Sequence, residues 1–288
     1  MSRPPAGAKT WSNPHAVLHA ASEPLGAALL RGEQLRAKLH TAGACALGSF
    51  LIELPTPAVL PALSLAGFDF VVLDLEHSSL DFSALQVLIT AAHAAGIAAL
   101  VRPHSAEAGL IGKILDMGAN GIMASHVDTA ERARAVVEAA RFPPRGTRSF
   151  SPLMKFDPLE HPLQALGDAT YVVAQIEGRA ALSRVDEIAA VAGVDALFVG
   201  PYDLALSLDV PPGSPEVRTL AQRALRGVPE AVSLGIYIDD PAQCGAWAEH
   251  GFRLQCVSFD GRLLANGARS VMSEATRALS ARRGESDQ

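Results

Sequence analysis

The stretch that decides the fold reads FVVLDLEHSSLDFSALQVLITAAHAAGIAALV at residues 70–101. It opens with the apolar, β-prone run Phe70–Leu75, which predicts a strand. The segment Phe82–Ala95 can form a helix, and a second β-prone run follows at Ala98–Val101. A strand, a helix and a strand in this order predict two parallel strands joined by a right-handed crossover.

The same alternation continues on both sides of this stretch. Strands are predicted at Leu47–Leu51, Phe70–Leu75, Ala98–Val101, Gly121–Ala124, Tyr171–Ile176, Ala196–Val199, Leu234–Ile238 and Leu254–Ser258. Each is followed by a segment that can be helical, at Ala58–Ala66, Phe82–Ala95, Ala106–Met117, Thr129–Arg141, Arg179–Val191, Glu216–Leu225, Pro241–His250 and Leu263–Ala281.

Eight such units over about 240 residues predict a single (β/α)8 barrel. The alternative is a doubly wound sheet, but the sequence has no GxGxxG or GxxxxGK phosphate loop after its first strand. We therefore expect one α/β barrel domain at residues 31–281. Residues 1–30 are predicted to be a flexible tail or an arm over a neighbour, and residues 282–288 a polar tail.

Composition excludes several classes of protein. The 288 residues carry a formal net charge of −6, which argues against a nucleic-acid binder with a basic face. No apolar run reaches the roughly 20 residues needed to cross a bilayer, and the N-terminus lacks a signal-peptide pattern. The three cysteines, Cys45, Cys244 and Cys256, provide no disulfide framework, so free thiols and a cytoplasmic location are expected.

In a barrel, chemistry gathers at the C-terminal ends of the strands. The second predicted strand ends in Asp74, Leu75, Glu76 and His77, where Asp74 and Glu76 share a face and an acid near a histidine can make it a general base. The third strand ends in Arg102, which suits a carboxylate or a developing oxyanion. A helix cap, a surface histidine and a structural ion pair are the alternatives.

Two carboxylates end neighbouring strands farther along the chain. Gln175 and Glu177 alternate onto one face at the end of the fifth strand, and Asp203 follows Gly200 and Pro201 after the sixth. Two carboxylates with few other protein ligands suit Mg²⁺ or Mn²⁺, which complete their shells with water and substrate oxygens. Alternatively, Asp203 caps a helix and Glu177 starts one.

The remaining candidates are weaker. His126 follows the fourth strand and either lines the pocket mouth or simply precedes the Asp128 or Thr129 cap. No HExxH, GxSxG or Cys/His zinc spacing is present, which leaves zinc proteolysis and serine hydrolysis without support. Four further histidines, on predicted helices or loops, are expected to be solvated: His93, His104, His161 and His250.

Seven short motifs, in this order, resemble the metal-dependent (class II) pyruvate aldolases of the HpcH/HpaI type. The resemblance covers about Leu35 to Ala278, and relatives with the same plan include the 2-keto-3-deoxy sugar-acid aldolases and macrophomate synthase. The motifs are Gly67-Phe68-Asp69-Phe70, Asp74-Leu75-Glu76-His77, Val101-Arg102-Pro103, Val127-Asp128-Thr129-Ala130-Glu131, Phe142-Pro143-Pro144-Arg145-Gly146, Gln175-Ile176-Glu177 and Gly200-Pro201-Tyr202-Asp203-Leu204.

The resemblance implies a role for each matched residue. Glu177 and Asp203 correspond to ligands of a divalent metal, Mg²⁺, Mn²⁺ or Co²⁺. His77, paired with Asp74, corresponds to the catalytic base, and Arg102 to the arginine that holds the pyruvate oxygens. Gln175 and Glu76 would position water or ligands. Gly200, Pro201, Tyr202 and Asp203 would bind the substrate, with the backbone N–H groups of Tyr202 and Asp203 receiving its carboxylate. A hexamer built as three dimers, with the last helix swapped between partners, is also implied.

The departures from the family pattern concern the aldehyde side of the pocket. Ser125 and His126 stand where members usually carry a proline and an apolar residue, and Tyr202 replaces a small residue. The stretch that contains Phe150 lacks the usual Gly-Ser pair. These positions, Ser125, His126 and Phe150 among them, are candidates for contacts with a modified, bulky acceptor.

The expected activity is therefore aldol cleavage or formation of a 4-hydroxy-2-oxo acid, with pyruvate and an aldehyde as the partner molecules. The strand ends carry no lysine for a Schiff base, and Lys155 lies in a predicted loop. Oxaloacetate decarboxylation and macrophomate-synthase-like bond formation use the same enolate and stay open. A non-catalytic assembly partner and a citrate-lyase-like thioester activity are further alternatives.

Overall fold

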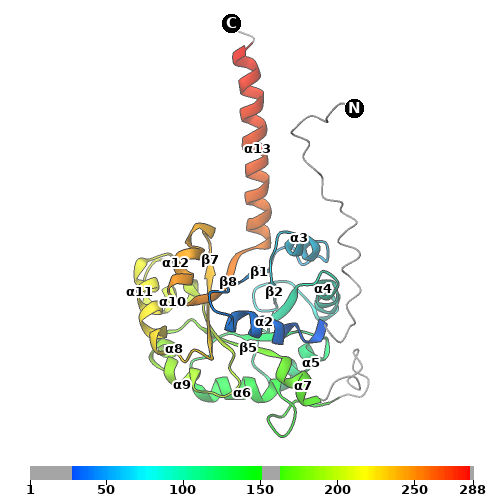
Figure 1. Cartoon of the computed structure of the whole chain (residues 1–288), viewed down its shortest axis with the longest axis vertical. Coiled ribbons are helices and arrows are strands. Elements are labelled where there is room, and N and C mark those ends of the chain that lie inside the picture. The colour runs from blue at the N-terminus through cyan, green and yellow to red at the C-terminus, as the bar shows by residue number, and fades with distance from the viewer. Residues whose placement is uncertain (1–27, 151–162, 286–288) are drawn as a thin grey trace, which may run out of the picture.

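The computed structural model describes residues 28–150 and 163–285, and it contains a closed barrel of eight parallel strands in sequence order. Helices surround this barrel (Figure 1). The expected single (β/α)8 barrel is therefore confirmed, and the doubly wound alternative is wrong. The strands are β1 Ala46–Leu51, β2 Phe70–Asp74, β3 Ala98–Arg102, β4 Gly121–Ala124, β5 Tyr171–Ile176, β6 Ala196–Val199, β7 Ser233–Ile238 and β8 Phe252–Phe259.

Most of the predicted helices are present, and the ends of α3, α4, α5, α6 and α11 differ from the predicted ones by two residues at most. Helix α12 begins three residues later than predicted, and α13 begins three residues earlier and ends four residues later. The predicted helix Arg179–Val191 is split in two, and three helices were not predicted: α2, α7 and α10. The helices are α2 Arg31–His40, α3 Val59–Leu65, α4 Phe82–Ala94, α5 Ala108–Asp116, α6 Ala130–Ala140, α7 Leu163–Ala169, α8 Arg179–Ser183, α9 Val185–Ala189, α10 Pro201–Leu208, α11 Pro215–Ala224, α12 Cys244–Glu249 and α13 Asp260–Glu285, with short 3-10 turns at Leu225–Gly227 and Pro241–Gln243.

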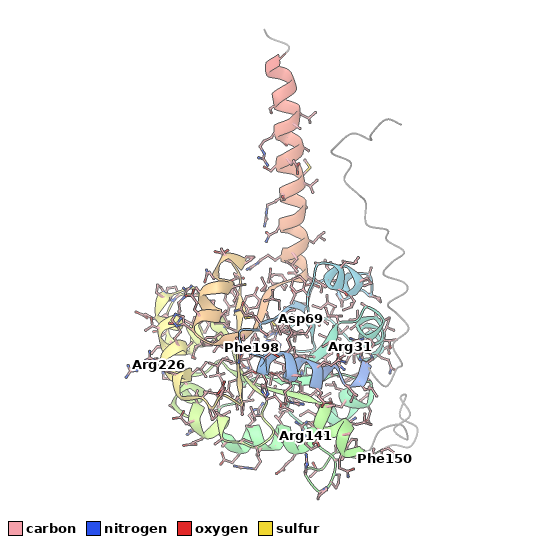
Figure 2. All side chains as sticks on the ribbon, in the orientation of Figure 1. Arg31, Asp69, Arg141, Phe150, Phe198 and Arg226 are labelled. Carbon is pink, nitrogen blue, oxygen red and sulfur yellow. The ribbon has the colours of Figure 1, made fainter. Side chains whose placement is uncertain are left out.

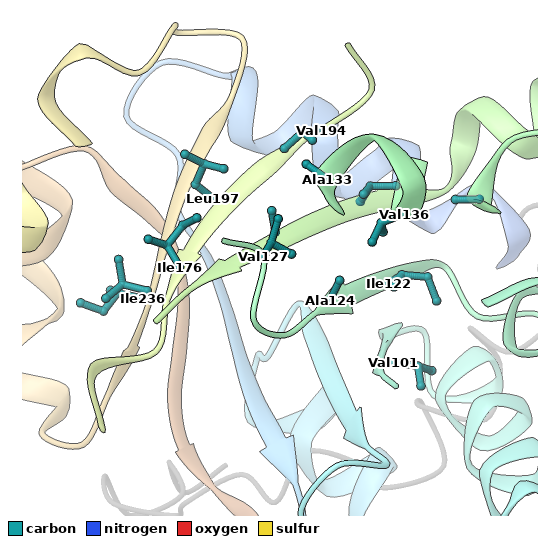
Figure 3. Close-up of a cluster of buried hydrophobic side chains, with 14 of the residues drawn as sticks. Val101, Ile122, Ala124, Val127, Ala133, Val136, Ile176, Val194, Leu197 and Ile236 are labelled. Carbon is teal, nitrogen blue, oxygen red and sulfur yellow. The ribbon is translucent and has the colours of Figure 1, made fainter. Parts of the chain in front are cut away.

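Each strand separates two apolar layers, because successive side chains point to opposite faces. On β2, Val71 and Leu73 belong to the outer layer between strands and helices, whereas Phe70 and Val72 belong to the layer inside the barrel. Figure 3 shows part of the outer layer, with Val101, Ile122 and Leu197 among its members. By the same alternation, a polar residue that lies two positions after the last inner apolar residue of a strand also points into the barrel.

Helix α13 leaves the barrel after β8 and projects away from it (Figure 1). Four large apolar side chains on it are 63–66% exposed, namely Leu264, Val271, Met272 and Leu279. The helix continues to Glu285, beyond residue 281, where we expected the domain to end. Residues 1–27, which make up most of the expected N-terminal arm, lie outside the described residues.

The three cysteines are free thiols, as expected, and Cys256 is fully buried inside the barrel. No helix in the described part of the chain is long and apolar enough to span a bilayer.

Candidate functional site

The predicted polar residues meet at one end of the barrel because of strand periodicity. Leu100 on β3 and Val173 on β5 lie in the inner layer, so Arg102 and Gln175, two positions later, also point inward. The pairing of β2 with β3 places Asp74 opposite Arg102. The strands thus bring together groups that are far apart in sequence.

Asp74 forms a bidentate ion pair with Arg102, and this differs from the expected pairing of Asp74 with His77. Arg102 Nε donates to Asp74 Oδ1 at 2.9 Å, and Nη2 donates to Oδ2 at 2.6 Å. Asp74 is fully buried, and Oδ1 also accepts the N–H of Glu76. Burial disfavours the guanidinium charge, but the hydrogen bond and charge of Asp74 outweigh it and raise the pKa of Arg102. Asp74 therefore fixes the arginine, because cross-strand register favours that partner over the loop residue His77.

Glu76 links the arginine to the loops that surround the site. Its Oε2 lies 3.3 Å from Arg102 Nε and 3.9 Å from His77 Nε2. Its Oε1 accepts a hydrogen bond of 2.9 Å from Ser125 Oγ and lies 3.6 Å from His126 Nε2. The nearest acidic partner of His77 is thus Glu76, and the His77 side chain is 60% exposed.

Glu177 is a buried carboxylate among other acids. Burial raises its pKa, and the charges of Asp203 and Glu76 raise it further, although the N–H and ring of His126 oppose them. His126 N–H donates to Glu177 Oε1 at 2.6 Å, and His126 Nδ1 lies 3.0 Å from the same oxygen. The other oxygen, Oε2, faces Gly200, where an added Cβ would lie 2.8 Å from it. Glu177 therefore keeps one oxygen directed toward the start of α10.

Helix α10 explains the placement of Asp203. Gly200 is its N-cap, Pro201 is in its first turn, and Asp203 lies in the same turn. Proline favours the first helical position because it has no N–H to satisfy there. A Cβ at Gly200 would also lie 2.8 Å from Gln175 Nε2, so only glycine allows this close approach.

These residues fit a hard divalent cation. Gln175 Oε1 is buried without a hydrogen-bond partner, beside the carboxylate of Glu177, whose pKa is raised. An orphaned oxygen and mutually repelling carboxylates are what a cation would satisfy. Among the described residues, no three His, Cys, Asp or Glu side chains gather closely enough to hold a metal by themselves. The donor set therefore suits an ion that takes further oxygens from water and substrate.

A cavity of about 370 Å³ opens beside these groups. Its polar side includes His77, Arg102, Gln175 and Asp203, with Gly200, Pro201 and Tyr202 nearby. The apolar wall of the cavity is made of Phe50, Ile52, Phe198, Tyr237 and Phe259. Arg102 lies over the ring of Phe50 at 4.9 Å, and Arg262, which also lines the cavity, lies over the ring of Phe259 at 5.0 Å.

The cavity does not contain the three residues predicted on the acceptor side. Ser125 and His126 contact the carboxylates from the loop after β4, and they do not line the cavity. Phe150 is 43% exposed at the periphery, whereas Phe198 lies within the barrel (Figure 2). His126 has a φ of 53°, which a non-glycine residue adopts rarely, so the loop holds this ring on Glu177 at some conformational cost.

Sequence reasoning missed the apolar wall. Phe50 and Tyr237 lie near the ends of β1 and β7, and Phe259 ends β8. The alternation of side chains between the two faces of a strand, considered for apolar as well as polar residues at every strand end, could have identified these aromatic residues. Arg262 lies in the first turn of α13, and no sequence motif indicated that it would line the cavity.

Residues 49–267 match the family model described as HpcH/HpaI aldolase/citrate lyase. The 2-dehydro-3,6-dideoxy-6-sulfogluconate aldolase of Pseudomonas putida is 32% identical over 78% of this chain and 91% of its own length. The hydroxypyruvate/pyruvate aldolase of Cupriavidus necator is 31% identical over 76% and 84%. The crystal structure of an HpcH/HpaI aldolase/citrate lyase family protein from Burkholderia cenocepacia J2315 matches with a TM-score of 0.78 and 31% identity, over 84% of this chain and 99% of that one.

Proposed function

Since this chain belongs to the HpcH/HpaI aldolase/citrate lyase family and is an aldolase of that class, we propose that it cleaves or forms 4-hydroxy-2-oxo acids through the enolate of pyruvate. The relatives named as aldolases of a 2-oxo sugar acid and of pyruvate support this reaction. The observation that carries the proposal is the buried Asp74–Arg102 pair, which presents a fixed guanidinium to the cavity beside Glu177 and Asp203.

Glu177 and Asp203 would hold a divalent cation, Mg²⁺, Mn²⁺ or Co²⁺, with Gln175 alongside. Bound there, the cation would act as a Lewis acid on the 2-oxo acid and increase the acidity of its methyl group. Hard cations prefer carboxylate and amide oxygens, which is the donor set at this end of the barrel.

Arg102 would bind the oxygen on which negative charge develops. Its two hydrogen bonds to Asp74 hold the guanidinium in place before the substrate arrives, so little reorganisation is needed during the reaction. The N-terminal backbone N–H groups of α10, at Tyr202 and Asp203, would receive the substrate carboxylate, because a helix N-terminus favours an anion.

His77 would move the proton of the aldol hydroxyl, directly or through water. It lines the cavity and has Glu76 as its neighbouring acid. An imidazole can accept a proton at one nitrogen and donate one from the other, which suits this exchange. None of the described residues that line the cavity is a lysine, and Lys155 lies outside the described residues.

We also propose a homo-oligomer in which α13 packs on a second copy of the chain, in a swapped dimer that assembles into a hexamer. The four large apolar side chains exposed on α13 support this, because such a surface favours a protein partner over water.

The experiment is a test of pyruvate release from a panel of 4-hydroxy-2-oxo acids, with and without EDTA. Release that stops with EDTA and returns with Mg²⁺ or Mn²⁺ supports the proposal. Release that continues in EDTA and is trapped by borohydride overturns it. Turnover of oxaloacetate without any aldol cleavage would favour the decarboxylase alternative.

A further inference from the structure

We infer that the acceptor of this enzyme is an uncharged aldehyde with an aromatic or bulky apolar group, bound on the aromatic wall that Phe50, Phe198, Tyr202 and Tyr237 form in the cavity lining. This inference rests on the proposed function, because it assigns the second substrate of the same site. It follows from the shape of the wall and from the pairing of the charges around it.

The wall is a continuous series of ring contacts that runs from inside the barrel to the mouth. The ring centroids of Phe198 and Phe50 are 6.3 Å apart, those of Phe50 and Tyr237 are 6.0 Å apart, and those of Tyr237 and Tyr202 are 5.8 Å apart. The ring planes are tilted by 50–68°, a geometry that rings favour. Phe50 is buried and Tyr202 is 40% exposed, so a further ring would meet the wall at its tyrosine end.

Aromatic residues are scarce in this chain, and the cavity concentrates them. They make up 5% of the sequence, yet two of the three tyrosines and three of the ten phenylalanines line this cavity. Phe50 lies against Arg102, whose guanidinium carbon is 4.9 Å from the centre of the Phe50 ring, so the rings adjoin the group proposed to bind the pyruvate oxygen. An aldehyde that approaches the enolate would therefore come into contact with this wall.

The charges at the mouth are already paired. Arg262 Nη1 donates to Asp239 Oδ1, and the hydroxyl groups of Tyr202 and Tyr237 donate to the two oxygens of the same carboxylate. Arg102, the other arginine of the lining, is paired with Asp74 and Glu76. Arg102 and Arg262 are the arginines among the described residues that line the cavity, and the first is already assigned to pyruvate. A carboxylate, sulfonate or phosphate on the acceptor would therefore have to compete with Asp239 for Arg262.

The reaction that this site would carry balances without any further reactant. Pyruvate loses one methyl proton, the resulting carbon forms a bond to the aldehyde carbonyl carbon, and the aldehyde oxygen takes up one proton. The aldehyde substituent does not react, so its contacts with the cavity lining decide how well the acceptor binds. An aromatic group there would gain apolar burial and ring contacts that a small aldehyde lacks.

The experiment compares aldol addition of pyruvate to benzaldehyde, propanal and succinic semialdehyde. Exchange of the pyruvate methyl protons with D₂O, measured without an aldehyde, reports the proposed function separately. We expect kcat/KM for benzaldehyde to exceed that for succinic semialdehyde at least tenfold. Methyl exchange together with a preference for succinic semialdehyde would overturn the inference and leave the proposed function intact. Absence of exchange would overturn both.

Variants test the wall and the paired charge separately. Tyr237→Ala should reduce the ratio of benzaldehyde to propanal kcat/KM about tenfold, whereas Tyr237→Phe, which keeps the ring, should preserve that ratio. Phe150→Ala is the matched control, since it removes an aromatic ring outside the cavity. Asp239→Asn frees Arg262 and should raise kcat/KM for succinic semialdehyde severalfold, with no such gain for benzaldehyde. An unchanged ratio in Tyr237→Ala would contradict the assignment of the wall.

Discussion

Arg102 is held by Asp74 through two parallel hydrogen bonds of 2.9 and 2.6 Å, and both side chains are buried inside the barrel. A buried bidentate ion pair of this kind fixes the plane of the guanidinium as well as its position. The aspartate that sequence reasoning assigned to the histidine thus orients the arginine, and the geometry of Arg102 is a property of the fold rather than of the bound substrate.

The first prediction concerns this pair. Asp74→Ala leaves the buried guanidinium with only its longer contact to Glu76, so the free energy of unfolding should fall by about 3 kcal/mol. Arg102→Lys keeps the charge but cannot form the bidentate pair with Asp74. The protein should therefore fold, while kcat for pyruvate release falls 100-fold or more. Urea unfolding and steady-state kinetics check the two effects. A kcat equal to that of the wild type in Arg102→Lys would contradict the role assigned to the bidentate Asp74–Arg102 pair.

The second prediction concerns the buried acid Glu177. Glu177→Gln removes a charge that burial and neighbouring acids disfavour, so the metal-free variant should be more stable than the wild type by about 1 kcal/mol. A gain of that size is a rise in Tm of roughly 2–4 °C. With excess Mg²⁺ the order should reverse, because the cation stabilises only the protein that binds it. Equal Tm values in EDTA and in Mg²⁺ would count against a cation site at Glu177.

The third prediction concerns His126, which we assign as a positioning residue. Its N–H and Nδ1 both contact Glu177 Oε1, which leaves Oε2 directed toward Gly200 and the start of α10. His126→Gly and His126→Ala should each weaken Mg²⁺ affinity about tenfold in calorimetry. Glycine adopts a positive φ without strain, whereas alanine does not. Comparison of the two variants therefore separates the effect of losing the ring from the effect of backbone strain.

His104→Ala, at an exposed loop position, is the control for these variants. If His126→Gly binds Mg²⁺ as tightly as the wild type does, the ring has no positioning role.

The fourth prediction concerns α13. Val271, Leu264 and Leu279 lie along one side of the helix by its 3.6-residue period, and Ser273 lies on the opposite side. Val271→Asp should therefore dissociate the proposed oligomer, whereas Ser273→Asp adds the same charge without this effect. Light scattering after gel filtration measures the mass. A wild-type monomer, or dissociation by both variants alike, would contradict the assembly proposed for α13.

The sequence predicted the barrel well because strand signals are local. The bounds of β4, β5 and β6 were predicted without error, since each is a short, mainly apolar run that is followed by a polar residue or a glycine. The inward direction of Gln175 also follows from period two alone.

The pairing of Asp74 with Arg102 could not be predicted from single strands, because it depends on the register between β2 and β3. The alternative in which Asp203 caps a helix placed the start of α10 too late, because Gly200 is the N-cap and Pro201 favours the first helical position. The apolar wall combines residues from β1, β7 and β8, so only the closed barrel brings Phe50 and Tyr237 together.

The most direct test of the central claim is the exchange of pyruvate methyl protons with D₂O, followed by proton NMR without any aldehyde. The EDTA-treated enzyme should exchange no faster than buffer, and added Mg²⁺ should restore exchange in the wild type but not in Asp203→Asn. Fast exchange by the EDTA-treated enzyme, together with inactivation by borohydride in the presence of pyruvate, would contradict a cation-assisted enolate at Glu177 and Asp203.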